Sequence, residues 1–78
     1  MGNHKIIIAS YVSERDGVGI EVYKNDQFVL EIFRDDTFRR RYINTYTDDV
    51  PLSLIEESIE YFKKNIQWDF IEYPSSLS

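Results

Sequence analysis

Cysteine is absent from this sequence of 78 residues, and long apolar runs are absent as well. Without cysteine, neither a disulfide framework nor a thiolate metal site can form. Because small secreted domains are usually rich in disulfides, we expect a cytoplasmic protein. No apolar run approaches the ~18 residues that a membrane-spanning helix needs, so we expect no membrane partner.

Groups that support catalysis are equally scarce. The single histidine is His4, and the three glycines, Gly2, Gly17 and Gly19, form no phosphate-binding loop. No serine lies in a G-x-S-x-G motif, and no ligand spacing typical of a metal site is present. The carboxylate pairs are adjacent residues, whose side chains point apart on a strand or a helix. We therefore expect a protein that is not an enzyme and that holds no cofactor or metal.

Aromatic residues, in contrast, are plentiful, because the chain holds five Phe, six Tyr and one Trp. A chain of this size buries only ~60% of its unfolded surface, so it needs a dense core or a partner. We expect a single domain over residues 1–73 and a disordered tail over residues 74–78.

The order of strand-like and helical segments predicts the fold. Four segments are rich in β-branched and aromatic residues and are separated by short turns: Lys5–Ser13, Val18–Tyr23, Phe28–Phe33 and Phe38–Thr47. A helix follows at Pro51–Ile66, where apolar residues recur at alternating steps of three and four: Leu52, Ile55, Ile59, Phe62 and Ile66. Ser53 and Glu56 have the spacing of a capping box. We predict an α+β fold, a four-stranded antiparallel β-meander with one amphipathic α-helix packed on one face.

Two features of this fold have alternative interpretations. A two-residue loop at Asn25-Asp26 would place Val22 opposite Val29, whereas a three-residue loop would place Val22 opposite Leu30. We favour the second pairing because it gives the cleaner apolar face. The segment Gln67–Tyr73 forms either a short extra C-terminal strand or an extended arm. We favour packing of this segment on the core over exposure to a partner.

The net charge of −5 is unevenly distributed along the chain. Residues 1–47 contain seven acidic and seven basic side chains, whereas residues 48–78 contain seven acidic and two basic ones. A cluster of carboxylates can imitate a phosphate backbone and occupy a basic nucleic-acid-binding cleft. The sequence therefore indicates a protein partner with a basic surface, and the following candidate binding residues: Asp48, Asp49, Glu56, Glu57, Glu60, Asp69 and Glu72.

An alternative function is nucleic-acid binding by Arg34, Arg39 and Arg41, which lie among aromatic residues that can stack on bases. Asp35 and Asp36 neutralise part of this cluster, and strand alternation divides it between two faces. We consider nucleic acid the less favoured partner for this acidic chain. A third alternative is a structural domain that forms homo-oligomers through an edge strand.

Three motifs resemble a loose group of short bacterial proteins. They are Asp16–Tyr23 (DGVGIEVY), Glu31–Asp36 (EIFRDD) and Pro51–Glu57 (PLSLIEE), and the likeness in pattern covers residues 14–66. Several members of that group look like immunity proteins of toxin systems, which are small strand-rich domains with one C-terminal helix. The resemblance implies stoichiometric binding to a cognate toxin and occlusion of its active site. Immunity proteins share no universal functional residues, so the resemblance assigns none here.

Overall fold

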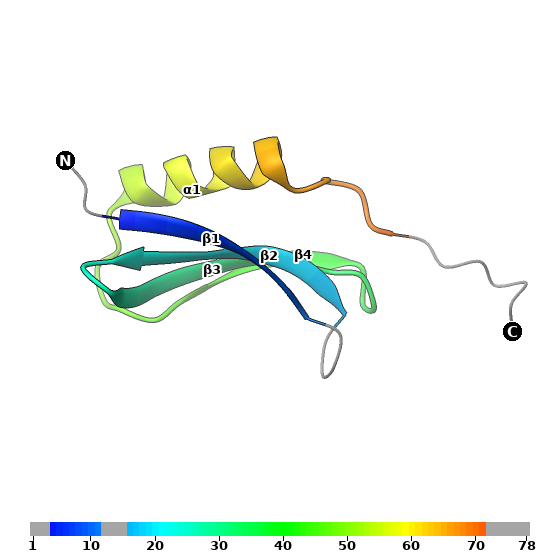
Figure 1. Ribbon diagram of the computed structural model, residues 1–78, viewed down its shortest axis with the longest axis horizontal. Helices are drawn as coiled ribbons and strands as arrows, with labels where there is room; N and C mark the ends of the chain where they lie inside the picture. The colour runs from blue at the N-terminus through cyan, green and yellow to red at the C-terminus, as the bar shows by residue number, and fades with distance from the viewer. Residues whose placement is uncertain (1–3, 12–15, 72–78) are drawn as a thin grey trace, which may run out of the picture.

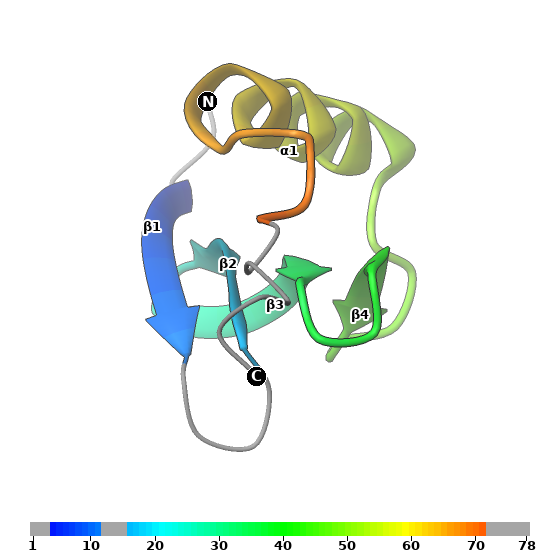
Figure 2. The same cartoon turned by 90° about the vertical axis from the view of Figure 1, so that its right-hand side faces the viewer.

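The computed structural model describes residues 4–11 and 16–71 (Figure 1). The elements follow one another as β1 (His4–Tyr11), β2 (Gly17–Lys24), β3 (Gln27–Asp35), β4 (Arg40–Thr45) and α1 (Leu52–Asn65). The strands form one antiparallel sheet in the order β1-β2-β3-β4. Figure 2 shows the sheet curved beneath α1, with β1 and β4 at its two sides. The predicted fold class is confirmed.

The hairpin between β2 and β3 combines both registers that the sequence allowed. Asn25 and Asp26 form a two-residue turn with φ values of 52° and 67°, as a type I′ turn requires. Val22 nevertheless lies opposite Leu30, because the register shifts by one residue and leaves Val29 without a partner on β2. The favoured pairing is confirmed, but the three-residue loop is wrong, and a β-bulge accounts for the difference.

The core lies between α1 and the concave face of the sheet. Ser58, at the centre of the buried face of α1, is fully buried, and its hydroxyl donates to the carbonyl of Leu54 at 2.7 Å. That bond satisfies the hydroxyl, so a small polar residue can face the sheet. The apolar residues of this core are Ile20, Val22, Val29, Leu30, Ile32, Leu54, Phe62 and Ile66.

The helix is rotated relative to the apolar stripe that the sequence predicted as its core face. Leu54, Ser58 and Phe62 are its buried residues, whereas Leu52 is 70% exposed and Ile59 is 38% exposed. The stripe prediction is therefore wrong for these two positions. The predicted stripe contained only apolar residues and so left out Ser58. Its burial depends on the hydrogen bond within the helix, which the sequence pattern does not show.

The start of α1 also differs from the prediction. The helix begins at Leu52 with Pro51 at the N-cap position, and no side chain forms a capping hydrogen bond. Ser53 lies inside the first turn, so the predicted capping box with Glu56 does not form. Backbone N–H groups of the first turn donate to the Pro51 carbonyl instead. Lys63 and Lys64 lie in the last turn, where cations interact favourably with the helix dipole.

Other boundaries also differ from the prediction. The second and third strands are longer at both ends, at Gly17–Lys24 and Gln27–Asp35. The fourth strand covers Arg40–Thr45 rather than Phe38–Thr47. Residues 67–71 form no strand, so the extra C-terminal strand is not observed in the part that the structure describes. Residues 72–73 and the predicted tail at residues 74–78 lie outside the described residues. No helix in residues 4–11 and 16–71 has the length and apolar character to cross a membrane.

Phe33 is fully buried on the face of the sheet opposite α1. It lies opposite Gly19 in the β2–β3 ladder. A Cβ atom at Gly19 would approach the Cα of Phe33 to 2.9 Å and its ring to 3.0 Å, and it would also overlap the carbonyl of Ile32. The missing side chain at Gly19 is therefore what allows the Phe33 ring to lie flat on the sheet.

Replacement of Gly19 by alanine should destabilise the protein by about 1–3 kcal/mol, because backbone or Phe33 must move to admit the methyl group. Urea unfolding followed by circular dichroism measures the change in unfolding free energy. Ser10→Ala, at an exposed position of β1, is the control and should shift it by less than about 0.5 kcal/mol. Equal effects of the two substitutions would contradict this account of Gly19.

Candidate functional site

Five exposed carboxylates occupy the N-terminal half of α1 and the loop before it. Glu56 and Glu60 lie one helical turn apart and face away from the sheet, and Glu57 lies on the flank nearest β1. There the Oε2 atom of Glu57 lies 2.8 Å from Nε2 of His4. We call this set the acidic surface: Asp48, Asp49, Glu56, Glu57 and Glu60.

The carboxylates of the acidic surface are almost without internal partners. Within residues 4–11 and 16–71, the one contact at ion-pair distance that involves any of them joins Glu57 to His4, which carries a charge only when its ring is protonated. No arginine or lysine of the described chain lies within ion-pair distance of the other four. Their charge is therefore directed to solvent and to any partner that approaches this side of the helix.

Two predicted members of the acidic set are not part of this surface. Asp69 follows the C-terminal end of α1, and a helix of 14 residues separates the two ends by about 21 Å. Asp69 therefore lies beyond the opposite end of α1 from Asp48 and Asp49. Figure 1 shows the segments that precede and follow the helix at its two ends. Glu72 lies outside the described residues. The sequence placed these groups together only because they share the last third of the chain.

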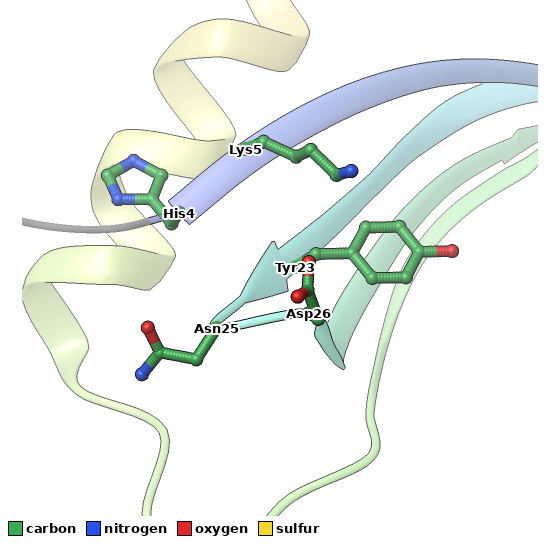
Figure 3. A pocket seen from close by; sticks show the side chains of 5 residues that line it. All are labelled: His4, Lys5, Tyr23, Asn25 and Asp26. Atoms are coloured by element: carbon green, nitrogen blue, oxygen red, sulfur yellow. The ribbon is translucent and has the colours of Figure 1, made fainter.

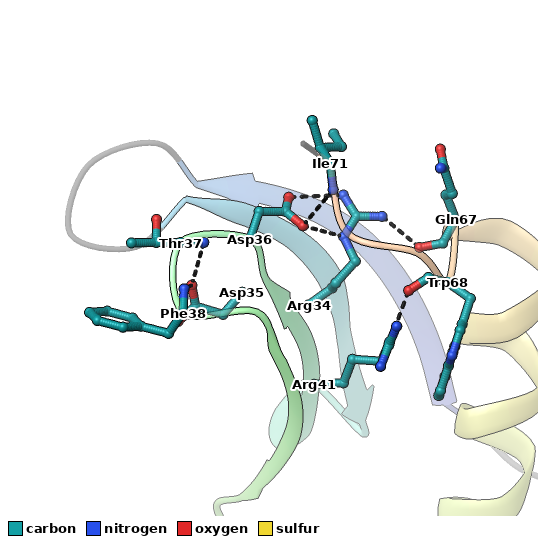
Figure 4. Close-up of polar contacts among 9 residues, drawn as sticks. All are labelled: Arg34, Asp35, Asp36, Thr37, Phe38, Arg41, Gln67, Trp68 and Ile71. Carbon is teal, nitrogen blue, oxygen red and sulfur yellow. Dashed lines mark hydrogen bonds and ion pairs between the residues drawn. The ribbon is translucent and has the colours of Figure 1, made fainter. Parts of the chain in front are cut away.

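Arg34, predicted as a nucleic-acid contact, is instead buried and only 2% exposed. Its Nε and Nη2 atoms donate to the two carboxylate oxygens of Asp36 at 2.9 and 3.1 Å, and its Nη1 atom donates to the carbonyl of Gln67 at 2.5 Å (Figure 4). Asp36 also accepts the N–H of Ile71 at 3.2 Å. This ion pair joins the end of the sheet to residues 67–71, which we call the C-terminal segment.

Arg41 contacts the same C-terminal segment. Its Nε atom donates to the carbonyl of Trp68 at 2.8 Å, and its guanidinium carbon lies 4.2 Å from the ring centroids of both Trp68 and Phe70. Arg39 is exposed and lies over Phe70 at 5.3 Å. The predicted set of Arg34, Arg39 and Arg41 therefore does not form one exposed basic surface, because Arg34 is buried and all three arginines contact the C-terminal segment.

The hollow in Figure 3 has a volume of about 290 Å³ and is lined by His4, Lys5, Tyr23, Asn25 and Asp26. The figure shows His4 directed toward α1 and Asn25 directed away from Tyr23, so the polar ends of these side chains diverge. General acid–base catalysis needs a positioned pair of groups, which this hollow does not supply. No group of three or more metal-ligating side chains lies close together in the described residues.

A second hollow lies between α1 and β4, and we call it the apolar groove. Its volume is about 220 Å³. Ile55 and Ile59 form its helix side, and Ile43 forms its strand side. The full lining is Ile32, Arg41, Tyr42, Ile43, Ile55, Ile59, Phe62 and Trp68. The sequence contained a signal for this groove, since the predicted stripe included Ile55 and Ile59, but the stripe was assigned wholly to the core.

A row of polar groups crosses the face of the sheet opposite α1. Glu21 and Glu31 lie directly opposite each other in the β2–β3 ladder. Glu31 is buried and accepts hydrogen bonds from Asn44 Nδ2 at 3.2 Å and from the Tyr46 hydroxyl at 3.1 Å. The Tyr23 hydroxyl donates to Glu21 at 2.9 Å, and this bond together with burial raises the pKa of Tyr23 above its usual 10.0.

Comparison with models of known protein families, with curated protein sequences and with solved structures finds no match.

Replacement of Arg34 by methionine should destabilise the protein by about 3–5 kcal/mol, because Asp36 would be left buried without its counter-ion. Urea unfolding followed by Trp68 fluorescence measures the loss. Arg40→Met is the matched control, since the Arg40 side chain is 64% exposed and lies 3.7 Å from Asp35. It should cost less than about 1 kcal/mol, because the pair is long and its arginine is solvated, and because the buried Asp35 keeps its hydrogen bonds from the N–H groups of Thr37 and Phe38. Equal losses would show that the Arg34 pair does not anchor the C-terminal segment.

Removal of the Glu21 carboxylate should lower the pKa of Tyr23, because the neutral phenol would lose its charged hydrogen-bond acceptor and the phenolate would lose a negative neighbour. A tyrosine whose folded pKa is raised contributes stability below its unfolded pKa of about 10 and loses it as pH rises through the folded value. NMR titration of the Tyr23 ring in the wild type and in Glu21→Gln measures the difference. An unchanged midpoint would disprove the assigned cause.

Proposed function

We propose that this chain is a non-enzymatic binding protein that attaches to a basic surface of a protein partner through the acidic surface. The observation that carries the proposal is the exposure of its carboxylates on the helix and its preceding loop without arginine or lysine partners in the described chain. Charges held in this way attract a basic partner and accelerate its association.

Not all of these carboxylates are placed where they would stabilise the fold. Asp48 and Asp49 precede α1, where negative charge is favoured by the positive end of the helix dipole. Glu56 and Glu60, however, lie one turn apart, and like charges at that spacing destabilise a helix by about 0.2–0.5 kcal/mol. A cationic partner would remove this repulsion. The arrangement is therefore better suited to binding than to stability alone.

The resemblance to immunity proteins supports one class of partner, a bacterial toxin domain with a basic cleft. A toxin that acts on nucleic acid needs cationic side chains along its substrate path. The acidic surface would occupy that path and exclude the phosphate backbone, so one copy of this chain would neutralise one toxin. The cysteine-free sequence fits action in the cytoplasm.

The alternative of nucleic-acid binding receives less support. Arg34 is buried against Asp36, and Arg41 is engaged with Trp68 and Phe70. Contact with a phosphate backbone would require at least Arg41 to leave the aromatic rings that it now covers.

The test is a pull-down from a nuclease-treated lysate of the source cells. The wild-type chain and the Glu56→Gln, Glu57→Gln, Glu60→Gln triple variant serve as baits, and the proteins that each retains are compared. Loss of the three charges should reduce retention of the specific partner at least about tenfold, since close charge pairs contribute about 1.5 kcal/mol or more at interfaces. Quantitative mass spectrometry of the retained proteins gives the ratio. Higher salt should weaken wild-type binding in the same direction.

Two single variants show whether binding depends on the acidic surface itself or only on the net charge of the chain. Glu56→Gln and Asp69→Asn remove one negative charge each, the first within the acidic surface and the second beyond the C-terminal end of α1. Only Glu56→Gln should weaken retention of the partner. The proposal fails if every protein retained by the wild type is retained equally by the triple variant, with circular dichroism showing all variants folded.

A further inference from the structure

The apolar groove adjoins an open edge of the sheet. Within residues 4–11 and 16–71, β4 pairs with β3 alone. Beside this edge, Ile43 is 41% exposed and Ile59 is 38% exposed. Leu52, one turn before Ile55 on the same flank of α1, is 70% exposed. Ile43, Ile55 and Ile59 thus line one exposed apolar hollow, and Leu52 extends the apolar flank of α1 beyond it.

The backbone of β4 offers hydrogen-bonding groups along that edge. The N–H of Tyr46 donates to the carbonyl of Val29 at 2.7 Å, in continuation of the β3–β4 ladder. Successive residues of a strand direct their N–H and C=O groups to opposite edges. The backbone N–H of Tyr46 points to β3, and Arg41, Ile43 and Thr45 are an odd number of residues away from it. Their N–H and C=O groups therefore point to the open edge.

Edge strands are usually protected by charged side chains that discourage pairing, but β4 has little such protection. Residues 42–45 carry no charge. Arg41 is drawn toward the C-terminal segment by its hydrogen bond to Trp68 and its stacking on Phe70. Arg40 lies over the Tyr42 ring at 5.0 Å. The central part of the strand edge is therefore open to another strand.

We propose that the occupant of this edge and of the apolar groove is a second copy of the chain, paired antiparallel through β4 about a two-fold axis at Ile43. In this register Ile43 lies opposite Ile43 of the second copy, and Arg41 lies opposite Thr45. The three outward-facing residues of each strand would together form about six backbone hydrogen bonds, because each hydrogen-bonded pair exchanges two. The sheet would continue across the dimer as eight strands.

The charge distribution favours this antiparallel arrangement over a parallel one. Arg39 and Arg40 lie at the start of β4, and Asp48 and Asp49 lie in the loop that follows it. Antiparallel pairing places the basic start of each strand beside the acidic loop of the other copy. A parallel pairing would place arginine beside arginine and aspartate beside aspartate. Complementary charge of this kind fixes register and orientation at interfaces.

The groove supplies the apolar part of the interface. Ile43 from each copy would approach the strip formed by Ile55 and Ile59 of the other, and α1 of the two copies would flank the seam on the same face. Glu56 and Glu60 face away from the sheet, so they stay exposed in the dimer. The inference goes beyond the proposed function and does not depend on it.

The decisive experiment introduces charge at the two-fold axis. In Ile43→Lys or Ile43→Glu each copy would present the same charge to itself, so self-association should weaken at least about tenfold. An equimolar mixture of the two variants should associate again, because lysine then faces glutamate. Ile7→Lys is the control, since Ile7 is 40% exposed on the opposite edge strand β1. It should associate as the wild type does.

Sedimentation velocity across micromolar to millimolar concentrations measures the association, and circular dichroism establishes that each variant is folded. Amide exchange at Arg41, Ile43 and Thr45 should also slow as wild-type concentration rises. A wild type that stays monomeric up to about 1 mM, a limit of about 4 kcal/mol in association free energy, would overturn the proposal. A dimer that tolerates both Ile43 variants, or whose mixture fails to recover, would also overturn it.

Discussion

The buried pair between Arg34 and Asp36 is the contact on which the C-terminal segment and the apolar groove depend. It holds the C-terminal segment against the end of the sheet through Gln67 and Ile71. That position places the Trp68 ring edge-on to Phe62, with ring centroids 6.2 Å apart, and so closes one end of the apolar groove. A buried ion pair repays its desolvation only when its remaining donors and acceptors are satisfied. Here the backbone of the C-terminal segment supplies those partners.

The same requirement explains how a small domain tolerates several polar groups in its interior. Glu31, Arg34, Asp35, Asp36 and Ser58 are all buried, yet no buried side-chain nitrogen or oxygen in the described residues lacks a hydrogen-bond partner. Asp35, for example, accepts the N–H groups of Thr37 and Phe38 and so holds the turn before β4. The Ser58 bond lies within α1, but each of the charged groups closes a turn or joins two segments. The contacts of Arg34, Asp35 and Asp36 thereby specify the geometry of one end of the sheet.

Local sequence patterns were sufficient for the fold class but not for the orientation of α1 or the roles of the arginines. The strand order and the Val22–Leu30 pairing follow from alternation and turn residues, which are local signals. The face of α1 depended on Ser58, whose burial is possible only with its bond to Leu54. The Arg34–Asp36 pair had a local signal, since residues two apart share a face of a strand. The contacts of Arg34 and Arg41 with the C-terminal segment, however, are long-range. Arg34 lies 33 positions before Gln67, and Arg41 lies 27 positions before Trp68, so local periodicity cannot predict them.

In the proposed dimer Asp48 and Asp49 lie near the seam, but the glutamates of the acidic surface lie on a different flank of α1 from the apolar groove, and their separation would have a functional consequence. Ile55 and Ile59 face the apolar groove, whereas Glu56 and Glu60 face away from the sheet. A dimer paired through β4 would therefore present two acidic helix faces on the same side of one continuous sheet. Against a partner with two basic sites, the second contact would form at the high effective concentration set by the first. Against a partner with one basic cleft, dimerisation would add no affinity, so comparison of Ile43→Lys with the wild type distinguishes bivalent from simple one-to-one binding.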